Sequence, residues 1–255
     1  MFNPFLLEGK NIIVTGASSG IGQQCAIDCS KMGAKVILIA RNEERLQQTL
    51  AQMEGEGHSY YLHDMEEIVN SGSAKDVVTK IVSEHGKVDG FIHSAGIEKT
   101  VPIKLLTIAD YEKVYKVNTL SAFEFIHQFS NKRFFNDGGH IVLISSITAV
   151  IGRGGVAAYA ASKGAMVSAV RSMALELARK NITINCVSPG TILTPLMQNY
   201  LNTLSPEDYG KRVDGFPLGL GNTTDISNAC IYLISDASRW ITGQNLVVDG
   251  GYTAR

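Results

Sequence analysis

The sequence predicts an α/β domain built on a mainly parallel, seven-stranded sheet with helices on both faces. Short apolar segments alternate with helical stretches along the 255 residues, which is the pattern of repeated strand–helix units. The apolar segments are rich in β-branched residues and often lack polar alternation, as expected for strands that are covered on both faces. No linker rich in proline, glycine and serine divides the chain. We therefore expect a single domain over residues 1–255.

The expected elements follow from these segments in order. Strands are predicted at Asn11–Thr15, Lys35–Ala40, Ser59–Leu62, Val88–His93, Gly139–Ser145, Thr183–Val187 and Asn245–Val248. Helices are predicted at Gly20–Met32, Glu43–Met53, Ser73–His85, Ile108–Phe134, Ala157–Lys180 and Thr224–Ser235.

Residues 188–222 form the longest stretch without a strand and contain four of the six prolines. Long loops in compact domains usually carry function, often as lids, so we expect a substrate loop at about residues 190–222. Candidate apolar walls of a substrate pocket in this loop are Leu196, Met197, Tyr200, Tyr209 and Phe216.

Composition excludes several classes of partner and site. The chain has 23 basic and 24 acidic residues, a balance that argues against nucleic-acid and membrane-surface binding. Four cysteines are too few for a disulfide framework in a chain of this length, and we expect them to be buried as small hydrophobic residues. The six histidines include no closely spaced pair, so no metal is assigned. The N-terminus lacks a basic segment and a long apolar segment, which predicts a reducing, cytoplasmic location.

A glycine-rich turn follows the first predicted strand, in Thr15-Gly-Ala-Ser-Ser-Gly-Ile-Gly22. Gly16 permits a tight turn, Gly20 lets the backbone approach a pyrophosphate, and Gly22 allows close packing of the helix. The N-terminus of the following helix faces the anion. This context predicts a dinucleotide site in a Rossmann-type, doubly wound domain. No Gly-Lys-Ser/Thr follows, so the turn is not a nucleotide-triphosphate loop of the Walker type.

A tyrosine and a lysine stand four residues apart in a predicted helix, at Tyr159 and Lys163. Side chains at this spacing lie on the same helix face. An ammonium group there favours the phenolate, which lowers the pKa of the phenol towards neutrality and makes it an acid–base group. The alternative is a tyrosine packed in the core beside a lysine that extends to solvent.

The two motifs together, Gly-x3-Gly-x-Gly and Tyr-x3-Lys, resemble the single-domain branch of the short-chain dehydrogenase/reductase family. The resemblance covers almost the whole chain and is closest in pattern to members that act as 3-oxoacyl-carrier-protein reductases. Further matching segments are Asn118 within Lys-Val-Asn, Ser145-Ser146 before Tyr159, Ser188–Thr194 and Thr242–Gly251. One departure is His93-Ser-Ala-Gly96, where the family often has Asn-Asn-Ala-Gly.

The resemblance implies a catalytic tetrad of Asn118, Ser146, Tyr159 and Lys163. In the family's mechanism the tyrosine gives or takes the proton, and the serine holds the carbonyl oxygen. The lysine lowers the pKa of the phenol and bonds the nicotinamide ribose, while the asparagine anchors a water that relays protons. The cofactor-binding residues implied in the same way are Gly16, Ser18, Ser19, Gly20, Ile21, Gly22, Arg41, Asp64, Ala95, Gly96, Asn118, Tyr159, Lys163, Pro189, Gly190, Ile192 and Thr194.

The end of the second predicted strand favours NADP(H) over NAD(H). NAD enzymes of this fold usually carry an acidic residue there, whereas this chain has Ala40 followed by Arg41. An arginine at this point binds a 2′-phosphate bidentately. The alternatives are that Arg41 is an ordinary surface arginine and that Asp64 is a helix cap. Some NADP-preferring relatives have a basic residue at the position of Ser19, which this chain lacks.

These features predict an NADP(H)-dependent oxidoreductase that moves a hydride between nicotinamide and a small ketone or secondary alcohol. The alternatives are an NAD-linked alcohol dehydrogenase and a regulator or scaffold that binds NADP without turnover. A carrier-protein reductase needs a basic docking patch near the mouth of its site. Lys132, Arg133 and Lys180 are candidates, but Asp137 lies among them, so acyl carrier protein is not assigned as a partner.

Two predicted helices look too apolar for a single buried face. Their apolar residues are Phe123, Phe125, Ile126 and Phe129 in one and Met166, Val167, Val170 and Met173 in the other. The family often pairs these helices into dimers, and C-termini complete tetramers. We therefore expect a homo-oligomer, either a dimer or a tetramer.

Overall fold

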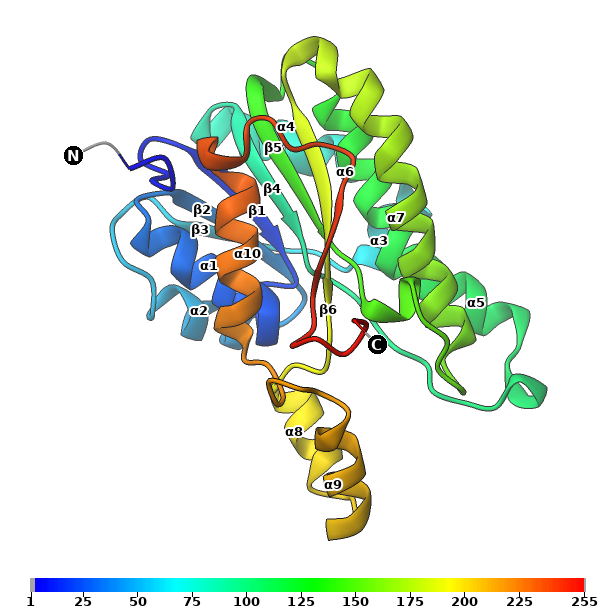
Figure 1. Ribbon diagram of the computed structural model, residues 1–255. Helices are drawn as coiled ribbons and strands as arrows, with labels where there is room; N and C mark the ends of the chain where they lie inside the picture. The colour runs from blue at the N-terminus through cyan, green and yellow to red at the C-terminus, as the bar shows by residue number, and fades with distance from the viewer. Residues whose placement is uncertain (1–2, 255) are drawn as a thin grey trace.

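The computed structural model describes residues 3–254, apart from the side chain of Leu196. Its sheet has seven strands in the order β3-β2-β1-β4-β5-β6-β7, and every neighbouring pair is parallel (Figure 1). The predicted Rossmann-type, doubly wound fold is confirmed. The strands are β1 (Asn11–Thr15), β2 (Lys35–Ala40), β3 (Ser59–Leu62), β4 (Val88–His93), β5 (Phe135–Ile144), β6 (Thr183–Pro189) and β7 (Asn245–Val248).

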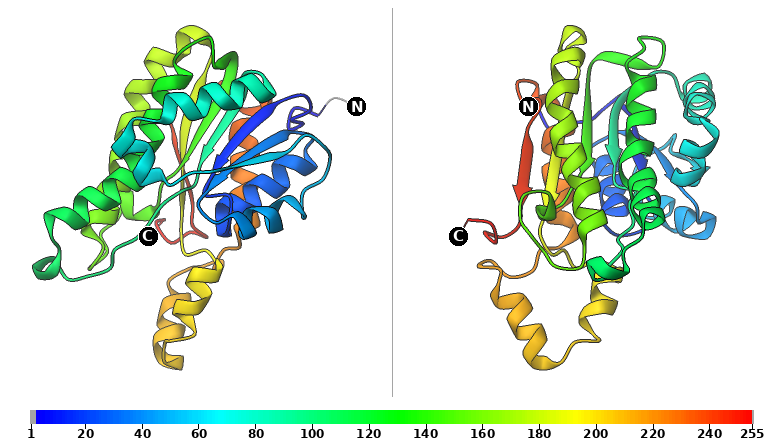
Figure 2. Two further views of the ribbon diagram at one scale, coloured as in Figure 1. Left: turned by 180° about the vertical axis from the view of Figure 1, so that it is seen from behind. Right: turned by 90° about the vertical axis from the view of Figure 1, so that its right-hand side faces the viewer.

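Helices cover both faces of the sheet and enclose two apolar cores (Figures 1 and 2). One face packs on α1 (Gly20–Lys31), α2 (Glu43–Leu50) and α10 (Thr223–Ile234). The other packs on α3 (Met65–Ser71), α4 (Ala74–His85), α6 (Ser121–Phe129) and α7 (Ala157–Leu177). Alternate residues of one strand serve opposite cores: Ile12 and Val14 face the first and Ile13 faces the second. This explains why the strand sequences are continuously apolar.

The helix predicted at Ile108–Phe134 is three elements. It consists of α5 (Ile108–Tyr115), a π-helical turn η2 (Lys116–Leu120) and α6, which ends at Phe129. Single π turns inside α-helices are frequent at functional sites. Asn118 lies at the centre of this one.

The stretch predicted to be a long loop contains two helices, α8 (Pro195–Leu201) and α9 (Pro206–Asp214). Both begin with a hydroxyl side chain followed by proline: Thr194 caps α8 and Ser205 caps α9. Proline suits the first helical position, where its missing N–H has no intrahelical partner to lose. These two helices project from the body of the domain at the end of the sheet where β6 terminates (Figures 1 and 2).

The apolar residues that suggested oligomerisation lie inside the monomer. Phe125, Ile126 and Phe129 of α6 belong to the core between the helices and the sheet, as do Met166, Val167 and Val170 of α7. Phe123 and Met173 pack against the same core. Six of the eight side chains are therefore buried within the monomer and two are partly buried, so these side chains do not by themselves indicate an interface, and the homo-oligomer stays a prediction.

The sheet grows outward from β1 in two directions. Strands β2 and β3 lie on one side of β1, and β4 to β7 lie on the other, so the topological switch point lies between β1 and β4. Ligands of doubly wound sheets bind at such a point, outside the carboxyl ends of the strands. Within residues 3–254, no helix combines the length and apolar character needed to cross a membrane.

Candidate active site

A cleft of about 1120 Å³ lies at the carboxyl ends of the strands. It brings together most of the residues that the sequence singled out, although they come from segments far apart in the chain. Those that line it are Gly16, Ser18, Ser19, Gly20, Ile21, Arg41, Asp64, Ala95, Gly96, Ser146, Tyr159, Lys163, Pro189, Gly190, Ile192 and Thr194. Gly22 and Asn118 are absent from this lining and lie behind Gly16 and Gly96, as described below.

The glycine-rich turn after β1 fits closely against its surroundings. Gly16 has φ of +68°, and a Cβ there would lie 2.7 Å from the backbone nitrogen of Ala95. A Cβ at Gly22 would lie 2.4 Å from the carbonyl oxygen of Gly16, so the start of α1 touches the turn itself. Ser19, the N-cap residue of α1, is extended and makes no side-chain cap. The first N–H groups of α1 therefore have no capping side chain and suit an anion.

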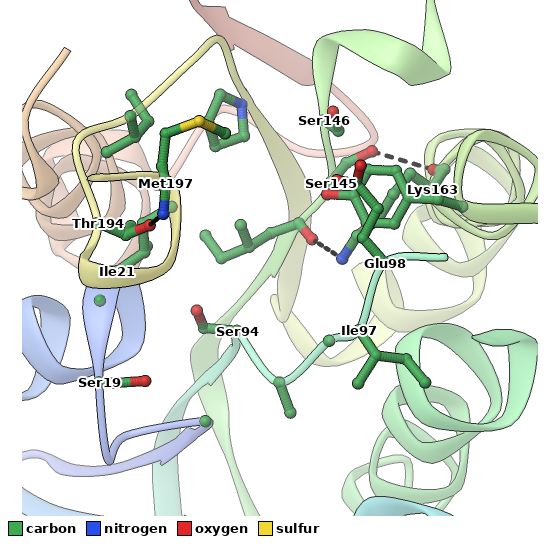
Figure 3. Close-up of a pocket in the computed structure, with 18 of the residues that line it drawn as sticks. Ser19, Ile21, Ser94, Ile97, Glu98, Ser145, Ser146, Lys163, Thr194 and Met197 are labelled. Carbon is green, nitrogen blue, oxygen red and sulfur yellow. Dashed lines mark hydrogen bonds between the residues drawn. The ribbon is translucent and has the colours of Figure 1, made fainter. Parts of the chain in front are cut away.

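The start of α8 lies across the same turn. A Cβ at Gly20, where φ is +58°, would lie 3.2 Å from Cγ2 of Thr194. Thr194 is held in place because its hydroxyl accepts a hydrogen bond from the backbone nitrogen of Met197 at 3.2 Å. In Figure 3, Thr194 and Met197 lie above Ser19 and Ile21, and face the segment that carries Ser94. The start of α8 and the glycine-rich turn thus form one side of the cleft.

The opposite side of the cleft carries Ser146, Tyr159 and Lys163. Ser146 follows β5 and has an extended backbone, and its hydroxyl oxygen accepts hydrogen bonds from Thr148, from N at 3.2 Å and Oγ1 at 3.0 Å. Because that oxygen already accepts two hydrogen bonds, its own proton is available to donate. Lys163 is buried and donates from Nζ to the carbonyl of Ile144 at 2.7 Å (Figure 3). Its Nζ lies 5.7 Å from the centre of the Tyr159 ring.

The pKa of Tyr159 is raised to about 12, mainly by burial and then by the charge of Glu98. Ser146 and Arg153 oppose this rise. The sequence predicted the opposite direction, with Lys163 lowering the pKa of the phenol. The difference has a physical cause: burial disfavours both charged forms, and it also lowers the pKa of Lys163 to about 8. In this structure the phenol is protonated at neutral pH.

Asn118 holds the wall behind Gly96 in place. Its Oδ1 accepts from the backbone nitrogen of Ile97 at 2.7 Å, and its Nδ2 donates to Ile97 O and to Ser162 Oγ, both at 3.0 Å. A Cβ at Gly96 would lie 3.3 Å from Oδ1 of Asn118 and 3.4 Å from Nζ of Lys163. The side chain of Asn118 therefore ties the segment after β4 to α7, and Gly96 leaves the ammonium accessible from the cleft.

At the far end of the cleft, Arg41 forms an ion pair with Asp64, with Nη1 and Oδ2 3.1 Å apart. Asp64 also caps α3, because Oδ1 accepts from the backbone nitrogen of Glu66 at 2.8 Å. The helix cap that the sequence left as an alternative for Asp64 is therefore present. Asn42 caps α2, because its Oδ1 accepts a hydrogen bond from the backbone nitrogen of Arg45 at 2.8 Å. Arg45 of α2 also lines this end of the cleft.

The departure from the family pattern at His93 has a structural role. His93 is fully buried at the end of β4 and shares a 2.9 Å hydrogen bond through Nδ1 with Thr15 Oγ1. That hydroxyl also accepts from the backbone nitrogen of Ala95 at 3.3 Å. Burial, aided by the charge of Lys163, lowers the pKa of His93 to about 3, so the ring is neutral. Through Thr15, it ties the start of the glycine-rich turn to the segment after β4.

The side chains in the cleft that sequence reasoning missed include Glu98, Thr148, Arg153 and Arg212. None belongs to a recognisable motif, and each reaches the cleft only through the tertiary fold. Of the expected apolar walls, Met197 and Phe216 line the cleft, whereas Tyr200 and Tyr209 are largely exposed and are not part of its lining. Leu196 lies outside the described side chains.

The candidate docking patch for acyl carrier protein lies away from the cleft. Lys132 and Arg133 immediately precede β5, and the cleft residue Ser146 follows its other end. Phe135 pairs with Val88 and Leu143 with His93, so the length of β4, about 17 Å of strand, separates the two. Lys132 is paired with Asp137 at 3.3 Å, and Lys180 donates to the carbonyl of Ser130. These residues therefore do not form a basic patch at the mouth of the site.

The chain was compared with known proteins. Residues 16–253 match a family model described as Enoyl-(Acyl carrier protein) reductase. A 3-oxoacyl-[acyl-carrier-protein] reductase of Chlamydia pneumoniae is 33% identical, covering 97% of this chain and 98% of that protein. The 7alpha-hydroxysteroid dehydrogenase of Escherichia coli K12 is 32% identical, covering 98% of each. A solved 7 alpha-hydroxysteroid dehydrogenase in complex with NADH and 7-oxo glycochenodeoxycholic acid superposes with a TM-score of 0.87 at 30% identity, covering 98% of each chain. This chain, a dehydrogenase/reductase in sequence and fold, therefore belongs to the short-chain dehydrogenase/reductase family.

Proposed function

We propose that this protein is an NADP(H)-dependent oxidoreductase that interconverts a ketone and a secondary alcohol, with Tyr159 as the proton donor or acceptor. The observation that carries the proposal is the grouping of Tyr159, Ser146 and Lys163 on one wall of a cleft whose opposite wall is the glycine-rich turn. When bound, the nicotinamide supplies or takes the hydride. The residues of this chain then have to place the carbonyl and move one proton.

The arrangement of Ser146 and Tyr159 suits carbonyl reduction. Hydride transfer to a carbonyl carbon leaves negative charge on the oxygen, which needs a proton donor and a hydrogen-bond donor at the same point. The raised pKa of Tyr159 keeps its proton in place. Thr148 occupies the lone pairs of Ser146 Oγ, which directs the serine O–H outward as a donor. In reduction the Tyr159 proton passes to the substrate oxygen, and in oxidation it returns.

Lys163 and Asn118 support this step. The Lys163 ammonium has three donors, of which one bonds the carbonyl of Ile144, and Gly96 leaves the group open to a ribose hydroxyl. Its positive charge stabilises the phenolate that forms when Tyr159 gives up its proton. The side-chain atoms of Asn118 are engaged with Ile97 and Ser162, so a water relay at Asn118 uses its backbone.

The preference for NADP(H) rests on the end of β2. Ala40 provides no carboxylate to repel a 2′-phosphate, and Arg41 and Arg45 both line this end of the cleft. The ion pair between Arg41 and Asp64 is exposed, and such pairs contribute about 0–1 kcal/mol, so a phosphate can displace the carboxylate. An NAD-linked enzyme is the alternative, since the related 7 alpha-hydroxysteroid dehydrogenase was solved with NADH.

A reducing, cytoplasmic compartment is part of the proposal. Cys25, Cys29, Cys186 and Cys230 are all free and buried. Burial raises the pKa of the Cys29 and Cys186 thiols, which keeps them protonated and unreactive. Such cysteines fit a compartment where thiols stay reduced.

The test is loss of NADPH absorbance across a panel of ketones, with NADH and secondary alcohols assayed in parallel. Replacing Tyr159 by Phe removes only the hydroxyl and should lower kcat by about 100- to 10,000-fold while NADPH still binds. The control is Tyr111→Phe, on α5 and outside the lining of the cleft. Parent-level turnover by Tyr159→Phe would show that the phenol is not the proton donor. NADPH binding without turnover of any ketone or alcohol would favour a regulator or scaffold.

A further inference from the structure

Two arginines line the cleft near Tyr159. Arg153 lies between β5 and α7, and Arg212 lies on α9 of the substrate loop. Both share the lining of this cleft with Tyr159 and Glu98, and the charge of Arg153 lowers the pKa of Arg212, as expected for neighbouring cations. The proposed reaction gives neither arginine a role.

Arg212 is partly buried without a counter-ion. Its Nη2 donates to Thr191 Oγ1 at 3.3 Å, and its guanidinium carbon lies 6.0 Å from the centre of the Tyr200 ring. Its Nε is buried without a hydrogen-bond partner. Among residues 3–254, no carboxylate lies within ion-pair distance of Arg212. Burying a charge is costly unless it is paired, so this arrangement suits an incoming anion.

Arg153 is only loosely paired. Its Nη2 lies 3.9 Å from Oε1 of Glu98, and the same oxygen accepts a hydrogen bond from Thr100 at 2.7 Å. Glu98 therefore pairs with Arg153 and not with Arg212, whose positive charge is left for the carboxylate of an incoming ligand to neutralise.

The corner of the cleft that Arg153 and Arg212 line is separate from the site proposed for the 2′-phosphate at Arg41. Arg41 follows β2, whereas Arg153 follows β5, and β1 and β4 lie between these strands. Three strand spacings amount to about 14 Å. A 2′-phosphate at Arg41 therefore leaves Arg153 and Arg212 for another ligand.

We infer that the substrate is a ketone or secondary alcohol that carries a carboxylate, and that Arg212 and Arg153 bind this carboxylate while the carbonyl faces Tyr159 and Ser146. The inference rests on the proposed oxidoreductase function. A guanidinium binds a carboxylate through two parallel N–H···O bonds, which fixes orientation as well as affinity. The arginines then act as specificity residues that set which carbonyl reaches the phenol.

Matched acid and ester substrates test the inference. The probes are 2-, 3- and 4-oxopentanoate and their methyl esters, assayed with NADPH and with NADH. We expect the parent to prefer at least one acid over its ester. Arg212→Gln should lower kcat/KM for that acid by about 10- to 150-fold, the cost of losing a hydrogen bond to a charged group, and should affect the ester much less. Arg212→Lys, which keeps the charge, should recover part of the loss.

The control is Arg179→Gln, because Arg179 is exposed and outside the lining of the cleft. It should keep the parent's preference for the acid. Calorimetric binding of the same probes provides a readout without turnover, and there too the acid should bind more tightly than the ester in the parent and lose this advantage in Arg212→Gln.

The outcomes separate the two proposals. Turnover of neutral ketones with no advantage for the acids, or an advantage unchanged in Arg212→Gln, would overturn this inference and leave the oxidoreductase function intact. Arginine-dependent binding of an acid without any turnover would support the anion site and count against the oxidoreductase function. Equal, weak binding of acid and ester by a protein without turnover would overturn both. A preference for dihydroxyacetone phosphate over every oxo acid would overturn the assignment of a carboxylate.

Discussion

Lys163 is a residue whose charge depends on its burial. Burial lowers the pKa of its ammonium group to about 8, whereas the pKa of Tyr159 is raised to about 12. Between these values the phenol keeps its proton and the lysine loses its charge. If ketone reduction needs both a protonated phenol and a charged lysine, kcat/KM should fall about tenfold per pH unit above about pH 8. The measurement is the pH profile of NADPH oxidation between pH 6 and about pH 10.

Lys163→Arg provides the control for this profile, because a guanidinium stays charged throughout that range. Its activity should be lower but should no longer fall above about pH 8. A parent profile that stays flat to about pH 10 would show that the charge of Lys163 does not limit reduction.

Arg41 is the residue that should decide cofactor preference. Arg41→Ala removes the proposed partner of the 2′-phosphate, and loss of a charge-assisted hydrogen bond should weaken NADPH binding by about 10- to 150-fold. NADH has no 2′-phosphate, so its affinity should change much less. Fluorescence titrations of both cofactors measure the difference. Equal weakening of NADPH and NADH binding would instead indicate that Arg41 contacts the adenosine or stabilises the fold.

The candidate site divides into residues that the sequence could and could not predict. Motif residues such as Tyr159 and Lys163 are predictable because their spacing is local to one helix. Arg212 joins the site from α9, almost fifty residues later, and its proximity to Arg153 depends on how the substrate loop packs. The pKa of Tyr159 also escaped prediction, since burial outweighs the neighbouring charge that the spacing suggested.

At the level of elements, the contact between α1 and the turn before it depends on Gly22. Gly22→Ala would place a Cβ 2.4 Å from the carbonyl oxygen of Gly16, so the turn or the helix must move. Overpacking of this kind costs about 1–3 kcal/mol, and we expect that loss in the free energy of unfolding. Displaced N–H groups should also weaken NADPH binding by about tenfold or more. Urea unfolding and cofactor titration measure the two effects.

Gly210→Ala is the matched control. Gly210 lies within α9, and a Cβ there would meet nothing within 4 Å. Alanine is a better helix former than glycine. The free energy of unfolding of this variant should therefore equal that of the parent or exceed it by up to about 1 kcal/mol. If Gly22→Ala behaves like Gly210→Ala, the turn has more freedom than its contacts indicate.

Elements marked by a strong hydrophobic pattern were predictable from the sequence. Helices marked mainly by the residues at their first turn were harder to predict. The strands β1 to β4 and β7 match their predicted bounds because short segments rich in β-branched, aromatic and other apolar residues mark them. The helices α8 and α9 were taken for loop because proline and glycine suggest breaks. Their Thr-Pro and Ser-Pro starts are helix N-termini, a local signal that the sequence does contain. The π turn at Asn118 has no such signal, since no proline or glycine interrupts its residues Lys116–Leu120.

At the scale of the whole molecule, several large apolar side chains are exposed, and two of them lie beside a further open surface. Ile108 at the start of α5 is 74% exposed, beside an apolar groove formed by Tyr111, Tyr115 and Leu120. Trp240 is 90% exposed just before β7, which is an edge strand of the sheet. Exposed apolar groups and open sheet edges favour association. These surfaces, rather than the buried faces of α6 and α7, support a homo-oligomer.

We expect the protein to sediment as a dimer or tetramer at micromolar concentration. Ile108→Lys and Trp240→Lys each place a charge on one of the two surfaces, so each should reduce the assembled mass if its surface is an interface. Loss of assembly in only one variant would identify a dimer through that surface, and stepwise loss in both would indicate a tetramer built from two interfaces. Leu175→Lys, at a 78% exposed position on α7, tests whether that helix takes part as well. A parent that sediments as a monomer at these concentrations would refute the oligomer and leave the cleft, which one chain forms by itself, as the complete site.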